Sequence, residues 1–191
     1  ISLFCNIDRA SVIESIDAPT IYEVPFNMLR EGLDIQVLKK LGISAKGEPD
    51  LEKWKSFLYR LKNPLTEVNI GLVGKYVELK DAYKSISEAF IHAGAATQCK
   101  VKIKWIHSEK LEDNPDCIQE ELQGLNGILV APGFGSRGIE GKIMAVRYAR
   151  ENKIPFLGIC LGMQCAVIEF ARNVLGYKDA HSVEMSASTT H

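Results

Sequence analysis

The sequence lacks a large excess of charge, a long apolar run and a cluster of cysteines. Its 23 lysines and arginines almost balance 24 aspartates and glutamates, and the net charge of −1 at pH 7 provides no basic field for nucleic acid. No run approaches the roughly 18 apolar residues of a membrane span, and no secretory signal opens the chain. The five cysteines are odd in number and widely spread. They predict free thiols in a reducing cytoplasm and no metal site.

The chain also lacks an initiator methionine, so we expect it to start inside a longer protein. Its 191 residues suffice for one sizeable domain, or one domain and a fragment. Residues 1 to about 43 contain an expected strand at 1–6 and a leucine-spaced helical stretch. These elements are too few to form a hydrophobic core of their own. Residues 44–66 are predicted to form a connector. Within it, Asp50 is expected to cap a helix after a turn.

From residue 67 onward, strands are expected to alternate with helices. The strands are predicted at 68–73, 101–106, 127–131 and 154–157. The helices are predicted at 81–95, 139–152 and 160–175, with Gly176 just beyond the last of them. This alternation predicts an α/β fold with a doubly wound, mostly parallel sheet, in which 101–106 is an edge or half-buried strand. Glycine-rich turns follow two of the strands at their carboxyl ends, where such sheets bind ligands.

One of these turns, Gly158-Ile159-Cys160-Leu161-Gly162, has the form of a nucleophile elbow with cysteine in place of serine. Cys160 is expected at a helix N-terminus, where unpaired N–H groups and the macrodipole favour a thiolate. The N–H of Leu161 would then point at a developing oxyanion. A lone cysteine is more often an inert buried residue. The strand–turn–helix context reverses that preference.

The other turn, Gly133-Phe134-Gly135, could supply a second donor to the oxyanion, or could be a plain turn. Its pairing with the elbow favours the donor. The run Gly71-Leu72-Val73-Gly74-Lys75 invites a P-loop interpretation. It fails because the two glycines are too close together for that motif and Tyr76 stands where serine or threonine is needed.

A cysteine nucleophile usually needs a base to take its proton. The chain has only four histidines, and none lies in a pattern that marks it as this base. They are His92, His107, His181 and His191.

Several segments resemble the CTP synthase family. They are residues 73–76, 81–85, 129–141 and 157–164, together with residues 1–43. The elbow is shared by all class I glutamine amidotransferases, whereas Lys75-Tyr76, the Arg137-Gly138-Ile139-Glu140-Gly141 run and residues 1–43 single out CTP synthase. The resemblance implies three parts: the C-terminal end of a synthase (amidoligase) domain at 1–43, an interdomain linker at 44–66, and the N-terminal part of a class I glutaminase domain at 67–191.

The resemblance also implies a parent enzyme, a ligase of pyrimidine biosynthesis in the cytoplasm. That enzyme makes CTP from UTP: glutamine is hydrolysed in one domain, and ammonia travels to the other. There ATP phosphorylates the uracil O4, and ammonia displaces the phosphate. The parent uses ATP and Mg²⁺, responds to GTP and forms a homotetramer. No cofactor, nucleic acid or membrane is implied for this chain itself.

Carried over residue by residue, the resemblance assigns a site. Cys160 resembles the nucleophile that forms a glutamyl thioester, and the N–H groups of Gly133 and Leu161 resemble the oxyanion hole. Gly133, Gln164 and Glu184 match positions that hold glutamine.

Three further residues match nucleotide positions of the family. Arg137 and Glu140 match a loop implicated in activation by GTP. Asp17 falls where the family contacts the ATP adenine.

The chain departs from the family pattern at Pro132, which replaces a glycine, and at residues 181–185 around Glu184. The family's catalytic His and Glu lie in a later His-Pro-Glu segment that this sequence does not contain. We therefore expect the isolated chain to turn over glutamine poorly. The alternatives are another enzyme with a cysteine elbow, such as a different class I amidotransferase or a DJ-1/PfpI-like hydrolase, and a non-catalytic fragment with an inert Cys160.

Overall fold

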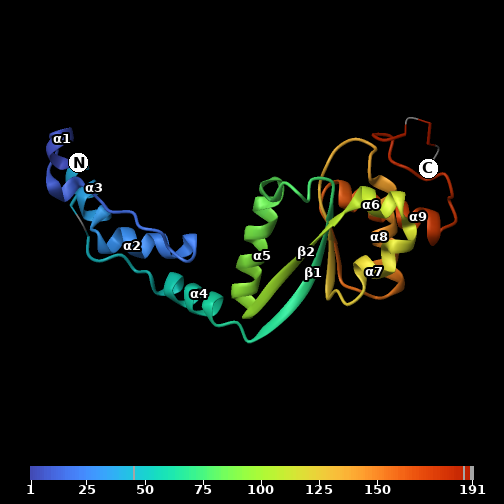
Figure 1. Cartoon of the computed structure of the whole chain (residues 1–191), viewed down its shortest axis with the longest axis horizontal. Helices are drawn as coiled ribbons and strands as arrows, with labels where there is room; N and C mark the ends of the chain where they lie inside the picture. Colours follow the sequence, from blue (N-terminus) through green and yellow to red (C-terminus); the bar gives the residue numbers. More distant parts are fainter. Residues whose placement is uncertain (45, 187, 190–191) are drawn as a thin grey trace. The chain divides into compact units, whose positions relative to one another are not determined.

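The computed structural model describes residues 1–44, 46–186 and 188–189 and divides the chain into two compact units, 1–62 and 63–191 (Figure 1). In these residues, no helix has the length and apolar character needed to cross a membrane.

The first unit is helical. Its elements are α1 (Ser2–Cys5), the 3₁₀ turns η1 (Arg9–Ser11) and η2 (Ile21–Glu23), and the helices α2 (Val24–Arg30), α3 (Leu33–Leu41) and α4 (Glu52–Lys62). The cap expected at Asp50 is present, since its Oδ1 accepts a hydrogen bond from the Glu52 N–H at 3.0 Å. The rings of Tyr22, Trp54 and Phe57 pack together, and the Trp54 indole donates to the Tyr22 carbonyl at 2.8 Å.

The strand predicted at residues 1–6 is wrong, because residues 2–5 form a single helical turn. A strand must satisfy its backbone groups on a neighbouring strand. Among the described residues of this unit there is no other strand. The chain instead bonds locally, with the Cys5 N–H donating to the Ile1 carbonyl at 2.8 Å.

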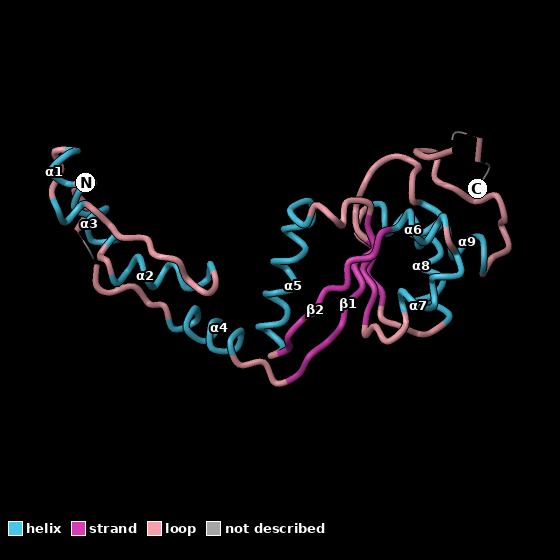
Figure 2. Tube along the Cα trace, in the orientation of Figure 1, coloured by secondary structure: helices cyan, strands magenta, loops and turns pink. Residues whose placement is uncertain are grey.

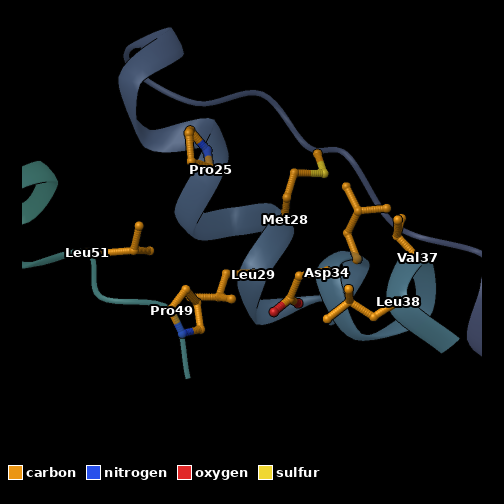
Figure 3. Close-up of a pocket in the computed structure, with 9 residues that line it drawn as sticks. Pro25, Met28, Leu29, Asp34, Val37, Leu38, Pro49 and Leu51 are labelled. Carbon is orange, nitrogen blue, oxygen red and sulfur yellow. The ribbon is translucent and has the colours of Figure 1, made fainter. Parts of the chain in front are cut away.

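An apolar pocket of about 520 Å³ lies in the first unit (Figure 3). Its walls come from α2, α3 and the segment before α4, and its lining residues are apolar except for one carboxylate. They are Pro25, Met28, Leu29, Leu33, Asp34, Val37, Leu38, Pro49 and Leu51.

The second unit is built on a parallel sheet in the order β2-β1-β3-β4. The strands are β1 (Thr66–Gly74), β2 (Cys99–His107), β3 (Gly127–Val130) and β4 (Phe156–Gly158). β2 is an edge strand, as its alternating pattern predicts. The helical elements are η3 (Lys80–Tyr83), α5 (Lys84–Thr97), α6 (Ser108–Asp113), η4 (Pro115–Cys117), α7 (Ile118–Leu122), α8 (Ile139–Glu151) and α9 (Leu161–Asn173).

Helices cover both faces of this sheet: α5 lies on one face, and α6 to α9 lie on the other (Figure 2). Neighbouring residues of β1 face opposite ways. Leu72 packs in the cluster that contains residues of α5, whereas Val73 packs in the cluster that contains residues of α8 and α9. Both side chains are fully buried. The doubly wound α/β fold is therefore confirmed for this unit, and the turns after β3 and β4 lie at the same end of the sheet.

Candidate active site

Cys160 occupies the sharp turn between β4 and α9. Its backbone has φ 53° and ψ −107°, which a residue with a side chain adopts only under strain of about 1–3 kcal/mol. The turn is fixed on both sides. The Ile159 N–H donates to the Val130 carbonyl at 3.1 Å, and the Cys160 carbonyl accepts from the N–H groups of Met163 and Gln164 at 3.0 and 3.2 Å. The side chain is left exposed to solvent.

The glycines on either side of this turn allow the backbone to pack closely. A Cβ on Gly158 would lie 2.5 Å from the carbonyl carbon and oxygen of Gly162. A Cβ on Gly162 would overlap the carbonyl oxygen of Val130 on β3. The start of α9 therefore sits directly against the end of β3, which places Cys160 beside the other glycine-rich turn.

That second turn, residues 131–135, is held by two buried lysines. The Lys142 ammonium, from α8, donates to the Ala131 carbonyl at 2.8 Å. The Lys75 ammonium, from the end of β1, donates to the carbonyls of Phe134 and Gly135 at 2.5 and 2.8 Å. Their side-chain contacts therefore direct three carbonyls of the turn toward the lysines.

The two N–H groups proposed for an oxyanion hole lie on these adjoining turns. A Cβ on Gly133 would be 3.5 Å from Cδ2 of Leu161, so the two residues are close neighbours. Within the described part of the chain, neither the Gly133 N–H nor the Leu161 N–H donates a hydrogen bond. Both donors remain free to bind a ligand.

Gln164 and Glu184, both predicted to hold glutamine, come together in the structure. Gln164 lies in the first turn of α9, and its Nε2 donates to Glu184 Oε2 at 3.2 Å. The Gln164 Oε1 is buried and has no hydrogen-bond partner in the residues that the structure describes. A buried acceptor without a donor is costly, so this oxygen is suited to receive an N–H from a ligand.

The residues predicted for the GTP loop are engaged in ion pairs. Arg137 Nε lies 2.9 Å from Glu109. Both carboxylate oxygens of Glu140 accept from Arg172 Nη1 at 2.9 Å, and Arg172 Nε donates to the Ala180 carbonyl at 2.7 Å. Glu140 thus connects α8, through α9, to the segment that carries Glu184.

Asp17 belongs to the first unit, where it is exposed in the segment between η1 and η2. It therefore belongs to a different unit from Cys160.

Lys75 does not have the position of a P-loop lysine. Its ammonium is turned to the carbonyls of residues 134 and 135, and its backbone N–H donates to the Tyr83 hydroxyl at 3.1 Å. Burial lowers the pKa of Lys75, and the neighbouring charge of Arg137 lowers it further.

No base for Cys160 emerges from the histidines. The Cys160 thiol makes no hydrogen bond with any residue that the structure describes. His181 Nδ1 accepts from the Ser182 N–H at 2.9 Å, His107 ends β2 with a buried, unpartnered Nδ1, and His92 lies within α5. His191 lies outside the described residues.

Comparison with known proteins decides the family. The family model described as "Glutamine amidotransferase class-I" matches residues 78–191, the part that contains both turns and α9. The chain belongs to the class I glutamine amidotransferase family.

The relatives of this amidotransferase are named CTP synthase. The whole chain is 69% identical to CTP synthase of Cytophaga hutchinsonii and 59% identical to that of Methanocaldococcus jannaschii, over 35% and 36% of those proteins. The chain thus spans about a third of the length of these relatives. The solved structure of Trypanosoma brucei CTPS, described as its glutaminase domain with bound acivicin, matches with a TM-score of 0.61 and 45% identity. That match covers 65% of this chain and 48% of the other. The resemblance to CTP synthase is confirmed.

Lys142 was not singled out from the sequence of this amidotransferase, although it is the largest fully buried side chain among the described residues. A signal was present: Lys142 is three residues after Ile139 on the buried stripe of α8, where an apolar residue is expected. Burial lowers the pKa of Lys142 to about 8. Burial also raises the pKa of the neighbouring Cys165 thiol to about 11, so that thiol is neutral at pH 7.

Replacing Lys142 with methionine is expected to raise the free energy of unfolding at pH 7 by about 1–2 kcal/mol. A fall in pKa from 10.5 to about 8 corresponds to a cost of about 3 kcal/mol for burying the ammonium. Methionine avoids this cost but loses the hydrogen bond to Ala131, which stabilises the lysine protein by about 1–2 kcal/mol. The net gain in stability is therefore about 1–2 kcal/mol. Urea unfolding of both proteins gives the difference.

The difference in free energy of unfolding between the two proteins should depend on pH. Between about pH 8 and 10.5 the unfolded chain keeps the Lys142 proton that the folded chain has released. The free energy of unfolding of the lysine protein therefore rises with pH across this window, and the advantage of methionine shrinks. The neighbouring Lys75 ammonium adds to the effect of burial on Lys142. A methionine variant that is less stable at pH 7, or a difference that does not vary with pH, would contradict this account.

Proposed function

We propose that this chain forms the glutamine-hydrolysing site of a CTP synthase, with Cys160 as the nucleophile. The observation that carries the proposal is the pairing of an exposed thiol on a strained turn with two adjacent N–H groups, from Gly133 and Leu161, that lack partners among the described residues. Such donors stabilise the negative oxygen that appears when an amide carbonyl is attacked.

The proposed reaction proceeds by acyl transfer. The Cys160 sulfur attacks the side-chain amide carbon of glutamine, and the carbonyl oxygen becomes negative beside the N–H groups of Gly133 and Leu161. The C–N bond then breaks, and ammonia leaves with the proton that the thiol gave up. The resulting thioester is cleaved by water, which releases glutamate and restores the thiol.

Gln164 and Glu184 are proposed to hold the substrate. The buried Oε1 of Gln164 can accept an N–H from the amino group of glutamine, and the Glu184 carboxylate beside it carries the charge that an ammonium requires. Gly133 completes this proposed set through its backbone N–H, which donates to no other described residue.

The larger reaction is proposed for the longer protein: UTP becomes CTP, ATP is consumed with Mg²⁺, and GTP acts as effector. The surrounding assignments are part of the same proposal. They are residues 1–43 as the end of the synthase domain, 44–66 as linker, Arg137 and Glu140 at the GTP loop, Asp17 near ATP, a homotetramer and a cytoplasmic location. The described residues contain no group of three His, Cys, Asp or Glu side chains able to hold a metal. No step through ATP or Mg²⁺ is assigned to them.

The proposal is tested by labelling the chain with a diazo-ketone analogue of glutamine, followed by intact-mass analysis and peptide mapping. We expect one adduct, on Cys160, and protection by excess glutamine. Because no base contacts the thiol in the described residues, we expect modification without efficient turnover of glutamine.

The labelling has a built-in control, because Cys5 is exposed as well. If labelling followed exposure alone, Cys5 and Cys160 would react alike and glutamine would protect neither. That outcome would reject the glutaminase proposal and favour a non-catalytic fragment.

A further inference from the structure

Lys142 is a buried cation that has no anionic partner among the described residues. Its side chain is fully buried, and it takes part in no ion pair between residues that the structure describes. It donates a hydrogen bond to the Ala131 carbonyl at 2.8 Å, and the nearby Cys165 thiol is neutral at pH 7. Burying an unpaired ammonium opposes folding, so the contribution of Lys142 to stability does not account for its presence.

The bond to Ala131 restricts the turn that carries the Gly133 N–H. Ala131 is followed by Pro132, whose ring fixes φ. Once the Ala131 carbonyl is held, ψ of Pro132 is the only free backbone rotation before the plane that contains the Gly133 N–H. The Lys142 Nζ also lies 3.5 Å from the position that a Cβ on Gly133 would take, so the ammonium sits against the turn itself.

Lys75 holds the other end of the same turn through the carbonyls of Phe134 and Gly135. With the carbonyls at both ends bound to ammonium groups, the Gly133 N–H keeps one direction. It remains without a partner among the described residues, next to Leu161. A preorganised donor costs nothing to reorient during the reaction.

We propose that Lys142 is a positioning residue of this site, which holds the Ala131–Gly133 turn so that the Gly133 N–H faces the oxygen that becomes negative. This inference rests on the proposed function. It predicts that Lys142 affects reagents whose carbonyl must enter the oxyanion hole and does not affect simple alkylation of Cys160.

The test compares Lys142→Met with Arg147→Met, a matched control on the exposed side of α8. For each protein, the diazo-ketone analogue gives a maximal inactivation rate and a half-saturating concentration, and iodoacetamide gives an alkylation rate at Cys160. For Lys142→Met we expect a maximal rate at least about tenfold lower, an unchanged half-saturating concentration and an unchanged iodoacetamide rate. Arg147→Met should match the parent chain in all three.

The outcomes separate the inference from the proposed function. Unselective labelling of the unsubstituted chain would reject the proposed function, and the inference with it. If the unsubstituted chain labels selectively and Lys142→Met labels at the same rate, the inference alone is rejected. The same holds if Lys142→Met lowers the rates with the diazo-ketone and with iodoacetamide equally. If Lys142→Met does not fold, Lys142→Gln gives the same comparison. Its amide nitrogen is one atom short of the Nζ position and should not reach the Ala131 carbonyl, so the same result is expected.

Discussion

Replacing Cys160 with serine is expected to reduce modification by the diazo-ketone glutamine analogue by at least about a hundredfold. A serine hydroxyl is a weak nucleophile unless a base removes its proton, and no histidine hydrogen-bonds to the side chain of residue 160 among the described residues. A cysteine sulfur is a much stronger nucleophile than a serine hydroxyl, and Cys160 lies exposed at the start of α9. The measurement is the rate at which the adduct mass appears.

Two matched variants make this prediction specific. Cys5→Ser removes another exposed thiol, and Cys99→Ser removes a half-buried one; both should label at the rate of the parent chain. If Cys160→Ser kept most of the labelling, another residue would be the site of attack, and the elbow would be only a structural turn. The class I family assignment would stand, but the nucleophile would have to be sought elsewhere.

The elbow and the sheet could be predicted because their determinants are local. Gly158 is needed by the backbone of the turn itself, because a Cβ there would meet Gly162. The alternation of strands and helices specifies a parallel sheet without knowledge of distant contacts. The sequence also placed β2 at an edge. Its alternating residues lie half-buried, as a strand with one neighbour requires.

The errors have the opposite origin. The apolar residues 1–6 read as a strand, but a strand needs a partner, and the first unit offers none among its described residues. The short helices α6 and α7, between β2 and β3, were not predicted. Each is too short to show a helical repeat, and packing stabilises them: Leu111 and Leu122 are fully buried in the core beneath α8.

The buried lysines could not be predicted because their partners are backbone carbonyls. A carboxylate partner can be sought in the sequence as an aspartate or glutamate, whereas every residue has a backbone carbonyl. Only the fold shows that Lys142 and Lys75 converge on residues 131–135. The hydrogen bond between Gln164 and Glu184 joins positions 20 residues apart. No local pattern marks this pair, and only the family resemblance assigned both residues to one site.

Replacing Gly162 with alanine is expected to lower the free energy of unfolding of the second unit by about 2–4 kcal/mol. Alanine would normally favour a helix over glycine by about 1 kcal/mol. Here its Cβ would overlap the carbonyl oxygen of Val130, which is backbone in the middle of the sheet and cannot rotate away. Relief requires α9 to move from β3, which breaks the packing of Leu161 and Cys165 in the core.

Met163→Ala is the matched control, because residue 163 is the next position of α9 and its side chain is 52% exposed. We expect it to change stability little. Urea unfolding followed by circular dichroism compares the two variants. The Gly162 variant should also label more slowly at Cys160, because moving α9 carries the Leu161 N–H away from Gly133. Gly162→Ala with unchanged stability would show that α9 does not press against Val130. The N–H groups of Gly133 and Leu161, which we propose as oxyanion donors, would then not be fixed side by side by this contact.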